Sequence, residues 1–155
     1  MRKSTLFLLV GLFLSTAWWG CKKYPDTDPM PAISNVPKLE LISVVPITVQ
    51  QLSDSIVFTV RYTDGNGDLG FAHADSMSVE LIDMRFPLTM RYHLQPLAPE
   101  GSDLILTGLL PIVLDNTILQ NQNATQENAT FQIRLKDRAG NWSNAVATPA
   151  VTVLP

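Results

Sequence analysis

Acidic and amide side chains alternate along one glycine-rich loop of the sequence. Asp64, Asn66 and Asp68 lie in the segment Asp64–Gly70, directly after a run of alternating apolar residues. Hard cations such as Ca²⁺ bind carboxylate and carbonyl oxygens, and calcium loops supply them from alternate positions. Asp75 falls at the twelfth position counted from Asp64, where such loops carry their last ligand. The spacing therefore motivates the hypothesis of a calcium site built on Asp64, Asn66 and Asp68.

The same loop departs from a calcium loop in two ways. Leu69 stands where a glycine makes the sharp turn, and Asp75 is shorter than the usual bidentate Glu. Gly supplies positive φ, while Asp and Asn hydrogen-bond their own backbone, so turn formation explains every residue type in both loops and is favoured over calcium. The glycines also fit G-x-G-x-x-G, but an alternating strand follows this loop, where a dinucleotide fingerprint needs a helix.

A second loop carries side chains of the same chemistry. Asp137 and Asn141 follow the alternating strand that begins at Phe131. If the strands before the two loops are the second and the sixth of a sandwich, both loops lie at one end of the fold. We therefore expect Asp137 and Asn141 to approach the first loop, where they would complete the calcium site.

Catalytic motifs are missing from the sequence. It has no G-x-S-x-G, no H-E-x-x-H and no P-loop. His73 lies beside the acidic loop and His93 lies on a predicted strand, so the two histidines are poorly placed to act together in one site. One Cys and two His cannot supply a zinc site with four such ligands. A non-enzymatic protein is therefore expected, and a small calcium-supported hydrolase is a further alternative.

The elements that must position these loops show a period of two. Apolar and polar residues alternate, as on a strand with one buried face, over residues 56–63, 77–82, 88–94 and 131–136. Leu104–Leu114 predicts a strand and a bend, because Gly108 and Pro111 interrupt it. Pro149 favours an edge strand or a switch between strands. No segment has the 3.6-residue stripe of a helix, so about seven strands are predicted.

This pattern predicts an all-β fold, an immunoglobulin-like antiparallel β-sandwich, because an open sheet would leave one apolar face in water. The segment Asp137–Ser143 reads DRAGNWS. It resembles the Asp-x-Ala-Gly-Asn-x-Ser turn of bacterial immunoglobulin-like and cadherin-like extracellular domains. The resemblance covers Leu39 to Val153 and implies the same sandwich, for a domain at residues 38–155.

The start of the chain has the features of an export signal. Two basic residues precede the apolar stretch Leu6–Leu14, which is too short to span a bilayer. With Gly20-Cys21 next, the chain resembles bacterial lipoprotein precursors of the Bacteroidota type, whose lipobox ends in a lipidated Cys. The resemblance implies a signal peptide at residues 1–20, cleavage before Cys21, and acyl chains on Cys21 that anchor the protein in a membrane.

A proline-rich segment separates the anchor from the predicted domain. Residues 21–37 hold Cys21 and four prolines, which favour extended backbone and predict a semi-rigid tether. The expected order is thus a signal peptide (1–20), a lipidated Cys with its tether (21–37) and a sandwich domain (38–155).

Composition narrows the choice of partners. Only 16% of residues are charged and the net charge is −3, so there is no basic footprint for nucleic acid. We expect an outer-membrane lipoprotein of the cell envelope, on its periplasmic or surface face, that serves protein interaction, adhesion or assembly, with Ca²⁺ as the candidate cofactor. The alternative is a glycan-binding accessory of a surface uptake system, for which Trp142 is the only Trp after Cys21.

Overall fold

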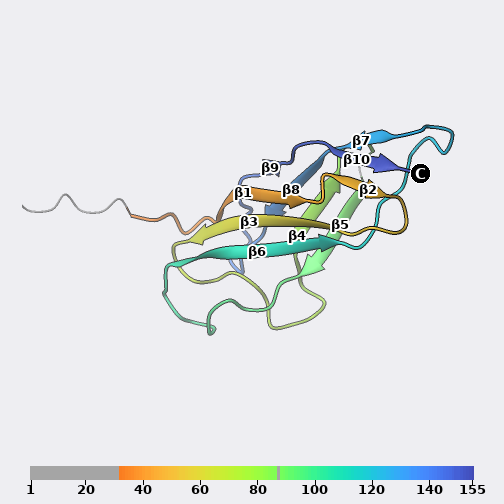
Figure 1. Cartoon of the computed structure of the whole chain (residues 1–155). Coiled ribbons are helices and arrows are strands. Elements are labelled where there is room, and N and C mark those ends of the chain that lie inside the picture. The colour runs from red at the N-terminus through yellow and green to blue at the C-terminus, as the bar shows by residue number, and fades with distance from the viewer. Residues whose placement is uncertain (1–31, 87) are drawn as a thin grey trace, which may run out of the picture. The chain divides into compact units, whose positions relative to one another are not determined.

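The computed structural model describes residues 32–86 and 88–155, which form an all-β fold (Figure 1). The predicted signal peptide, Cys21 and the tether up to residue 31 lie outside the described residues. No helix in the described part is long and apolar enough to cross a membrane. The strands found there are β1 (Lys38–Val45), β2 (Thr48–Gln50), β3 (Ile56–Asp64), β4 (Met77–Asp83), β5 (Leu88–His93), β6 (Leu106–Leu114), β7 (Glu127–Ala129), β8 (Phe131–Leu135), β9 (Val146–Ala147) and β10 (Val151–Leu154).

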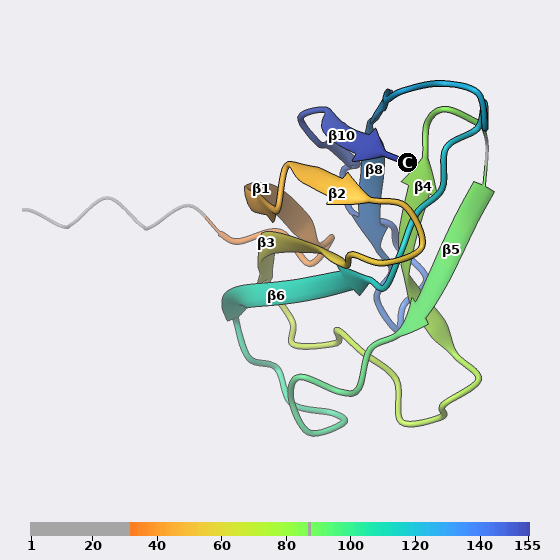
Figure 2. The same ribbon diagram turned by 45° about the vertical axis from the view of Figure 1, so that its right-hand side comes forward.

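These strands form three sheets. Their orders are β1-β3-β6, β5-β4-β8-β9 and β2-β10-β7. Only the pairing of β2 with β10 is parallel, so the prediction of an antiparallel all-β fold is confirmed. Figures 1 and 2 show β1, β3 and β6 on one side of the domain and β4, β5 and β8 on the other.

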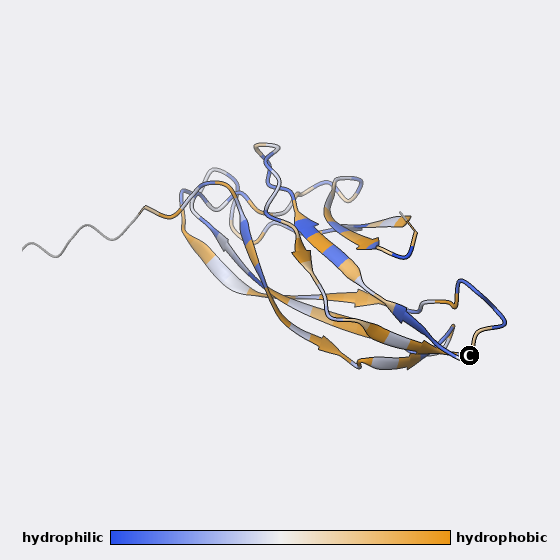
Figure 3. Ribbon diagram, turned by 90° about the horizontal axis from the view of Figure 1, so that it is seen from above, coloured by the Kyte–Doolittle hydropathy of each residue, from blue (hydrophilic) through white to orange (hydrophobic). Residues whose placement is uncertain are grey.

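Side chains from both sides meet in one core, which gives the domain a sandwich-like arrangement of two layers. Phe58 of β3 and Phe131 of β8 are fully buried and pack edge to face, with ring centroids 5.1 Å apart. The alternation predicted from the sequence is visible along the strands (Figure 3). Further buried core residues are Leu39, Val49, Ile56, Val60, Val79, Leu81, Ile112, Ile133, Leu135, Val151 and Val153.

The described part has more strands than the sequence predicted, because the chain crosses between sheets at three breaks. Pro46 separates β1 from β2, Thr130 separates β7 from β8, and Pro149 lies between β9 and β10. Proline has no backbone N–H, so it ends a hydrogen-bonded ladder. The strand switch predicted at Pro149 is confirmed, since β9 pairs with β8 whereas β10 pairs with β7 and β2.

The bend predicted within Leu104–Leu114 is wrong. β6 pairs with β3 without interruption, and Pro111 lies opposite Thr59. In the described part β6 has β3 as its one neighbour, and an edge strand tolerates a proline whose nitrogen faces the open side. A side chain at Gly108 would collide with the ring of Tyr62, which explains the glycine in this strand.

Candidate functional site

The two loops predicted to meet lie side by side. Leu69 of the first loop and Asp137 of the second form an antiparallel bridge. The backbone N–H of Arg138 donates to the carbonyl oxygen of Asp68 at 3.0 Å. The loops after β3 and β8 therefore share one end of the domain, which brings Asp64, Asp68 and Asp137 into one neighbourhood.

The acidic and amide side chains of this cluster bond to one another and to the loop backbone. Asp64 is fully buried and accepts a hydrogen bond from the N–H of Asp68 at 3.1 Å. With its amide nitrogen turned toward the carboxylates, Asn66 donates to Asp64 Oδ2 at 3.2 Å and to Asp68 Oδ1 at 3.0 Å. Asp137 is also fully buried, and it accepts from the backbone N–H of Asn141 at 2.7 Å and from Asn141 Nδ2 at 2.9 Å. This is the hydrogen bonding by which Asp and Asn stabilise turns.

Arg138, which the sequence did not single out, holds the first loop from inside the cluster. Its guanidinium donates to the carbonyl oxygens of Gly67 at 3.0 Å, Gly70 at 2.9 Å and Leu69 at 3.4 Å. Backbone carbonyls are the ligands that a calcium loop adds to its carboxylates. Here three of them accept hydrogen bonds from a permanent side-chain cation.

The electrostatics of the cluster are set by burial. Burial raises the pKa of Asp64, and the nearby Asp68 and Asp137 carboxylates raise it further, while the N–H groups of Asp68 and Gly67 oppose the shift. Among the residues that the structure describes, no group of three or more His, Cys, Asp or Glu side chains is arranged to hold a metal ion. The observed contacts favour turn formation, and calcium binding stays a prediction.

Two glycines of the first loop are required by backbone conformation. Gly67 and Gly70 have φ values of 73° and 83°, which L side chains rarely adopt. A side chain at Gly70 would also collide with the backbone of Gln95. The G-x-G-x-x-G spacing is therefore explained by the turn, and the next element is strand β4 rather than a helix.

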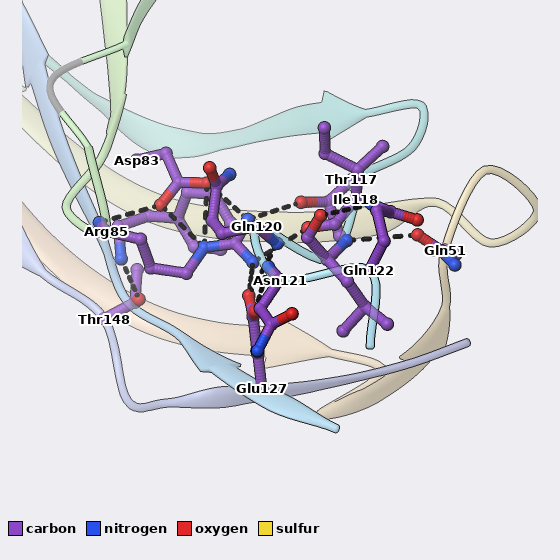
Figure 4. A network of polar contacts seen from close by, with 12 residues as sticks. Gln51, Asp83, Arg85, Thr117, Ile118, Gln120, Asn121, Gln122, Glu127 and Thr148 are labelled. Carbon is purple, nitrogen blue, oxygen red and sulfur yellow. Dashed lines mark hydrogen bonds and ion pairs between the residues drawn. The ribbon is translucent and has the colours of Figure 1, made fainter. Parts of the chain in front are cut away.

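A second polar cluster, missed by sequence reasoning, surrounds Arg85 (Figure 4). The side chain of Arg85 is only 10% exposed. It donates to Asp83 Oδ2 at 2.6 Å, Glu127 Oε2 at 3.2 Å, Thr117 Oγ1 at 2.9 Å and the Ile118 carbonyl at 2.9 Å. We call this cluster the Arg85 clamp, because it ties the connection between β6 and β7 to the turn after β4.

Glu127 extends the Arg85 clamp along the connection. Its carboxylate accepts from the backbone N–H of Gln120 at 2.8 Å and of Asn121 at 2.6 Å. These backbone hydrogen bonds lower the pKa of Glu127, and the charge of Arg85 adds to the effect. Residues 117–121 are thus held by several polar contacts, some part-buried and others exposed.

Next to the Arg85 clamp, a groove runs between β5 and the chain from Leu110 to Gln120. It consists of a hollow of about 380 Å³ and an adjoining one of about 350 Å³, and both are lined by Tyr92 and Asp115. Burial raises the pKa of Tyr92, and the Asp115 carboxylate adds to the shift. The walls combine apolar and polar side chains. The apolar ones include Phe86, Leu88, Met90, Val113, Leu114 and Ile118, and the polar ones include Asp83, Arg85, Asp115, Asn116, Thr117 and Gln120.

The opposite, outward face of β5-β4-β8 is charged. Glu80 is 5% exposed and lies in register with Arg91 of β5 and Arg134 of β8. It accepts hydrogen bonds from Arg91 Nε at 3.0 Å and from Arg134 Nε at 2.7 Å, and Arg134 Nη2 forms an ion pair with it at 2.6 Å. Burial alone would raise the pKa of Glu80, but the two arginines outweigh it and lower the pKa. The guanidinium of Arg134 also lies 4.2 Å from the centre of the Trp142 ring.

Trp142 and the two described tyrosines lie in different surroundings. Trp142 lies beside Arg134 and Lys136, whereas Tyr62 and Tyr92 pack against the core. His93 bonds to the Ser76 carbonyl through Nδ1 at 3.0 Å.

Comparison with known proteins adds no relative: no family model, no curated protein and no solved structure matches the chain.

Proposed function

We propose that this chain is a membrane-anchored, non-enzymatic protein of the cell envelope, which presents an immunoglobulin-like β-sandwich to a protein partner. The observation that carries the proposal is the groove beside β5, to which this strand contributes Leu88, Met90 and Tyr92. In the described part β5 pairs with β4 alone, so its other edge offers free backbone donors and acceptors next to the groove.

The immunoglobulin-like type is supported by the way the strands are shared between the layers. A three-stranded sheet, β1-β3-β6, packs against strands β4, β8 and β10, and the chain exchanges sheets at Pro46 and Pro149. The loops after β3 and β8 meet at one end, as in sandwiches that present loops at their ends.

The groove suits a segment of protein chain. Small-molecule pockets enclose their ligands, whereas this groove is open along a strand edge and leaves Leu88 47% exposed and Ile118 41% exposed. An extended segment that adds to a free edge gains backbone hydrogen bonds and inserts alternate side chains between the layers. The Arg85 clamp fixes the far wall before a partner arrives, which lowers the entropic cost of binding.

The anchor is supported by the lipobox-like Gly20-Cys21 after a short apolar stretch. Mass spectrometry of the protein purified from membranes of the producing cells tests it. We expect loss of residues 1–20 and acyl chains on Cys21, and we expect Cys21→Ser to carry neither change. An intact Met1, or an unmodified Cys21 thiol, would overturn the anchor.

The groove is tested by photo-crosslinking in the same cells. A photoreactive residue replaces Leu88, which lines the groove, or Leu109, which is 57% exposed on the outward side of β6 and serves as the matched control. We expect one defined protein adduct from position 88 and none from position 109. Equal adducts from both positions would contradict a partner in the groove. An adduct with carbohydrate would favour the glycan-binding alternative.

A further inference from the structure

The charged residues on the outward face of β5-β4-β8 form a ladder of alternating sign. Arg134, Glu80 and Arg91 lie directly opposite one another on adjacent strands β8, β4 and β5. Glu80 contacts both arginines, at 2.6 Å and 3.0 Å. Opposite charges facing each other across strands stabilise a sheet, and like charges destabilise it.

The two ends of this ladder differ. At one end Arg134 lies against the ring of Trp142, at 4.2 Å. At the other end Arg91 is 58% exposed at the free edge of β5, and it uses Nε for Glu80. Within the described residues its two Nη atoms have no hydrogen-bond or ion-pair partner. The ladder therefore ends, at an open strand edge, on a guanidinium that is paired with Glu80 through Nε and has two Nη atoms without a partner.

The inward side of β5 is apolar, in contrast to its charged outward side. Leu88, Met90 and Tyr92 alternate with the outward residues and line the groove. A strand added beside β5 would point every second side chain toward these residues. Its remaining side chains would lie outward, beside Thr89, Arg91 and His93.

From these two faces we infer the sequence character of the partner, an inference that rests on the proposed function. The free edge of β5 accepts an extended segment in which apolar residues alternate with polar ones, and an acidic residue falls opposite Arg91. The apolar side chains fill the groove, and the acidic one continues the alternation of charge across the sheet.

A second copy of this chain does not satisfy the same edge through its own β5. Directly opposed residues of antiparallel strands lie on one face of the sheet. The outward residues that a second β5 could place opposite Arg91 are Thr89, Arg91 and His93, and none of them is acidic. Pairing of Arg91 with itself would bring like charges together, which disfavours self-association at this edge.

The inference is tested with two blocked synthetic peptides. One has the sequence Thr-Val-Thr-Val-Glu-Val-Thr-Val-Thr, and the other has Lys in place of the Glu. Calorimetry measures the affinity of each for the protein, and amide hydrogen exchange locates the site. We expect protection at Leu88–His93 and about tenfold tighter binding of the Glu peptide, since one cross-strand charge pair changes sign between them.

Substitutions of the two matched arginines complete the design. Arg91→Glu should make the protein bind the Lys peptide more tightly than the Glu peptide, and Arg91→Gln should make the two affinities equal. Arg61 forms the equivalent exposed pair with Glu40 on the other sheet, so Arg61→Gln should leave the preference unchanged. Equal affinities for both peptides, or no protection of β5 with either one, would overturn the inference. If position 88 crosslinks to a protein in cells but the two peptides bind equally, the inference about the acidic residue is wrong and the proposed function still stands.

Discussion

At the scale of single residues, the two loops show which chemistry a sequence reveals and which it hides. The sequence indicates Asp64, Asn66 and Asp68 because their oxygens recur at short spacing, and Asp137 because the sandwich topology brings its loop to the same end. It does not indicate Arg138, because its guanidinium bonds to backbone carbonyls, which every residue type supplies. A pattern of oxygen-bearing side chains therefore predicts a polar loop but does not identify the cation that the loop holds.

The occupied oxygens of this cluster predict the response to calcium. The melting temperature of residues 32–155 should be the same in 1 mM Ca²⁺ as in the presence of a chelator. The reason is that Arg138 and the loop N–H groups already bond to the available oxygens. Thermal unfolding with Ca²⁺ and with chelator checks this. A cation at 100 times its dissociation constant would add about 2.7 kcal/mol to the free energy of unfolding, and such a rise would support a calcium site in this cluster.

Glu80 predicts a pH-dependent loss of stability. The arginines hold its pKa lower in the folded than in the unfolded chain, so its charge stabilises the fold above the ordinary pKa of a glutamate. This contribution disappears as the pH falls through the folded-state pKa. Glu80→Gln should reduce the free energy of unfolding by about 1–2 kcal/mol at neutral pH and by much less near pH 3. Urea unfolding at both pH values measures the difference, and an equal loss at both would contradict the ion-pair explanation.

At the scale of elements, periodicity predicted the strands but not the contacts that fix their connections. Arg85 and Glu127 are 42 residues apart in the chain. Before the fold is known, the polar connection from Asp115 to Thr130 offers many equivalent partners for one arginine. Only the pairing of β4 with β8 and of β7 with β10 brings this Glu to the turn after β4. The groove was missed for the same reason, because its two walls belong to different sheets.

The Arg85 clamp predicts a local opening when it is broken. Arg85→Ala leaves the nearly buried Asp83 carboxylate without its ion pair, which should cost about 3 kcal/mol of stability. Amide exchange should accelerate most at residues 117–121. Arg61→Ala removes an exposed pair of the same type and should cost less than about 1 kcal/mol. Unchanged exchange at 117–121 in Arg85→Ala would show that the clamp does not hold the wall of the groove.

At the scale of the whole molecule, the period of two was sufficient for the fold class and too coarse for the strand count. Ile56, Phe58 and Val60 were placed on a buried face by alternation alone, and all are fully buried. The breaks at Pro46 and Thr130 went unpredicted because alternation continues across a strand that changes sheets. Which edges remain free follows from the sheet order, and that depends on pairings between distant segments.

The shared core predicts a large effect for its central aromatic pair. Phe58→Ala should reduce the free energy of unfolding by about 3–5 kcal/mol, because it removes packing against Phe131 of the opposite layer. Leu109→Ala, on the outward side of β6, should stay within about 0.5 kcal/mol. Chemical denaturation of both variants measures these values. A small loss for Phe58→Ala would mean that the two layers do not unfold as one unit.

The central claim is that an envelope-anchored sandwich binds a protein partner along β5. Amide hydrogen exchange of the full chain, measured in isolated envelopes and again after purification in detergent, tests it most directly. We predict that the amides of Leu88–His93 are protected in the envelope and exchange faster once the partner is removed, while those of β1, an edge strand that does not line the groove, stay the same. Equal exchange of β5 in both preparations would contradict the claim.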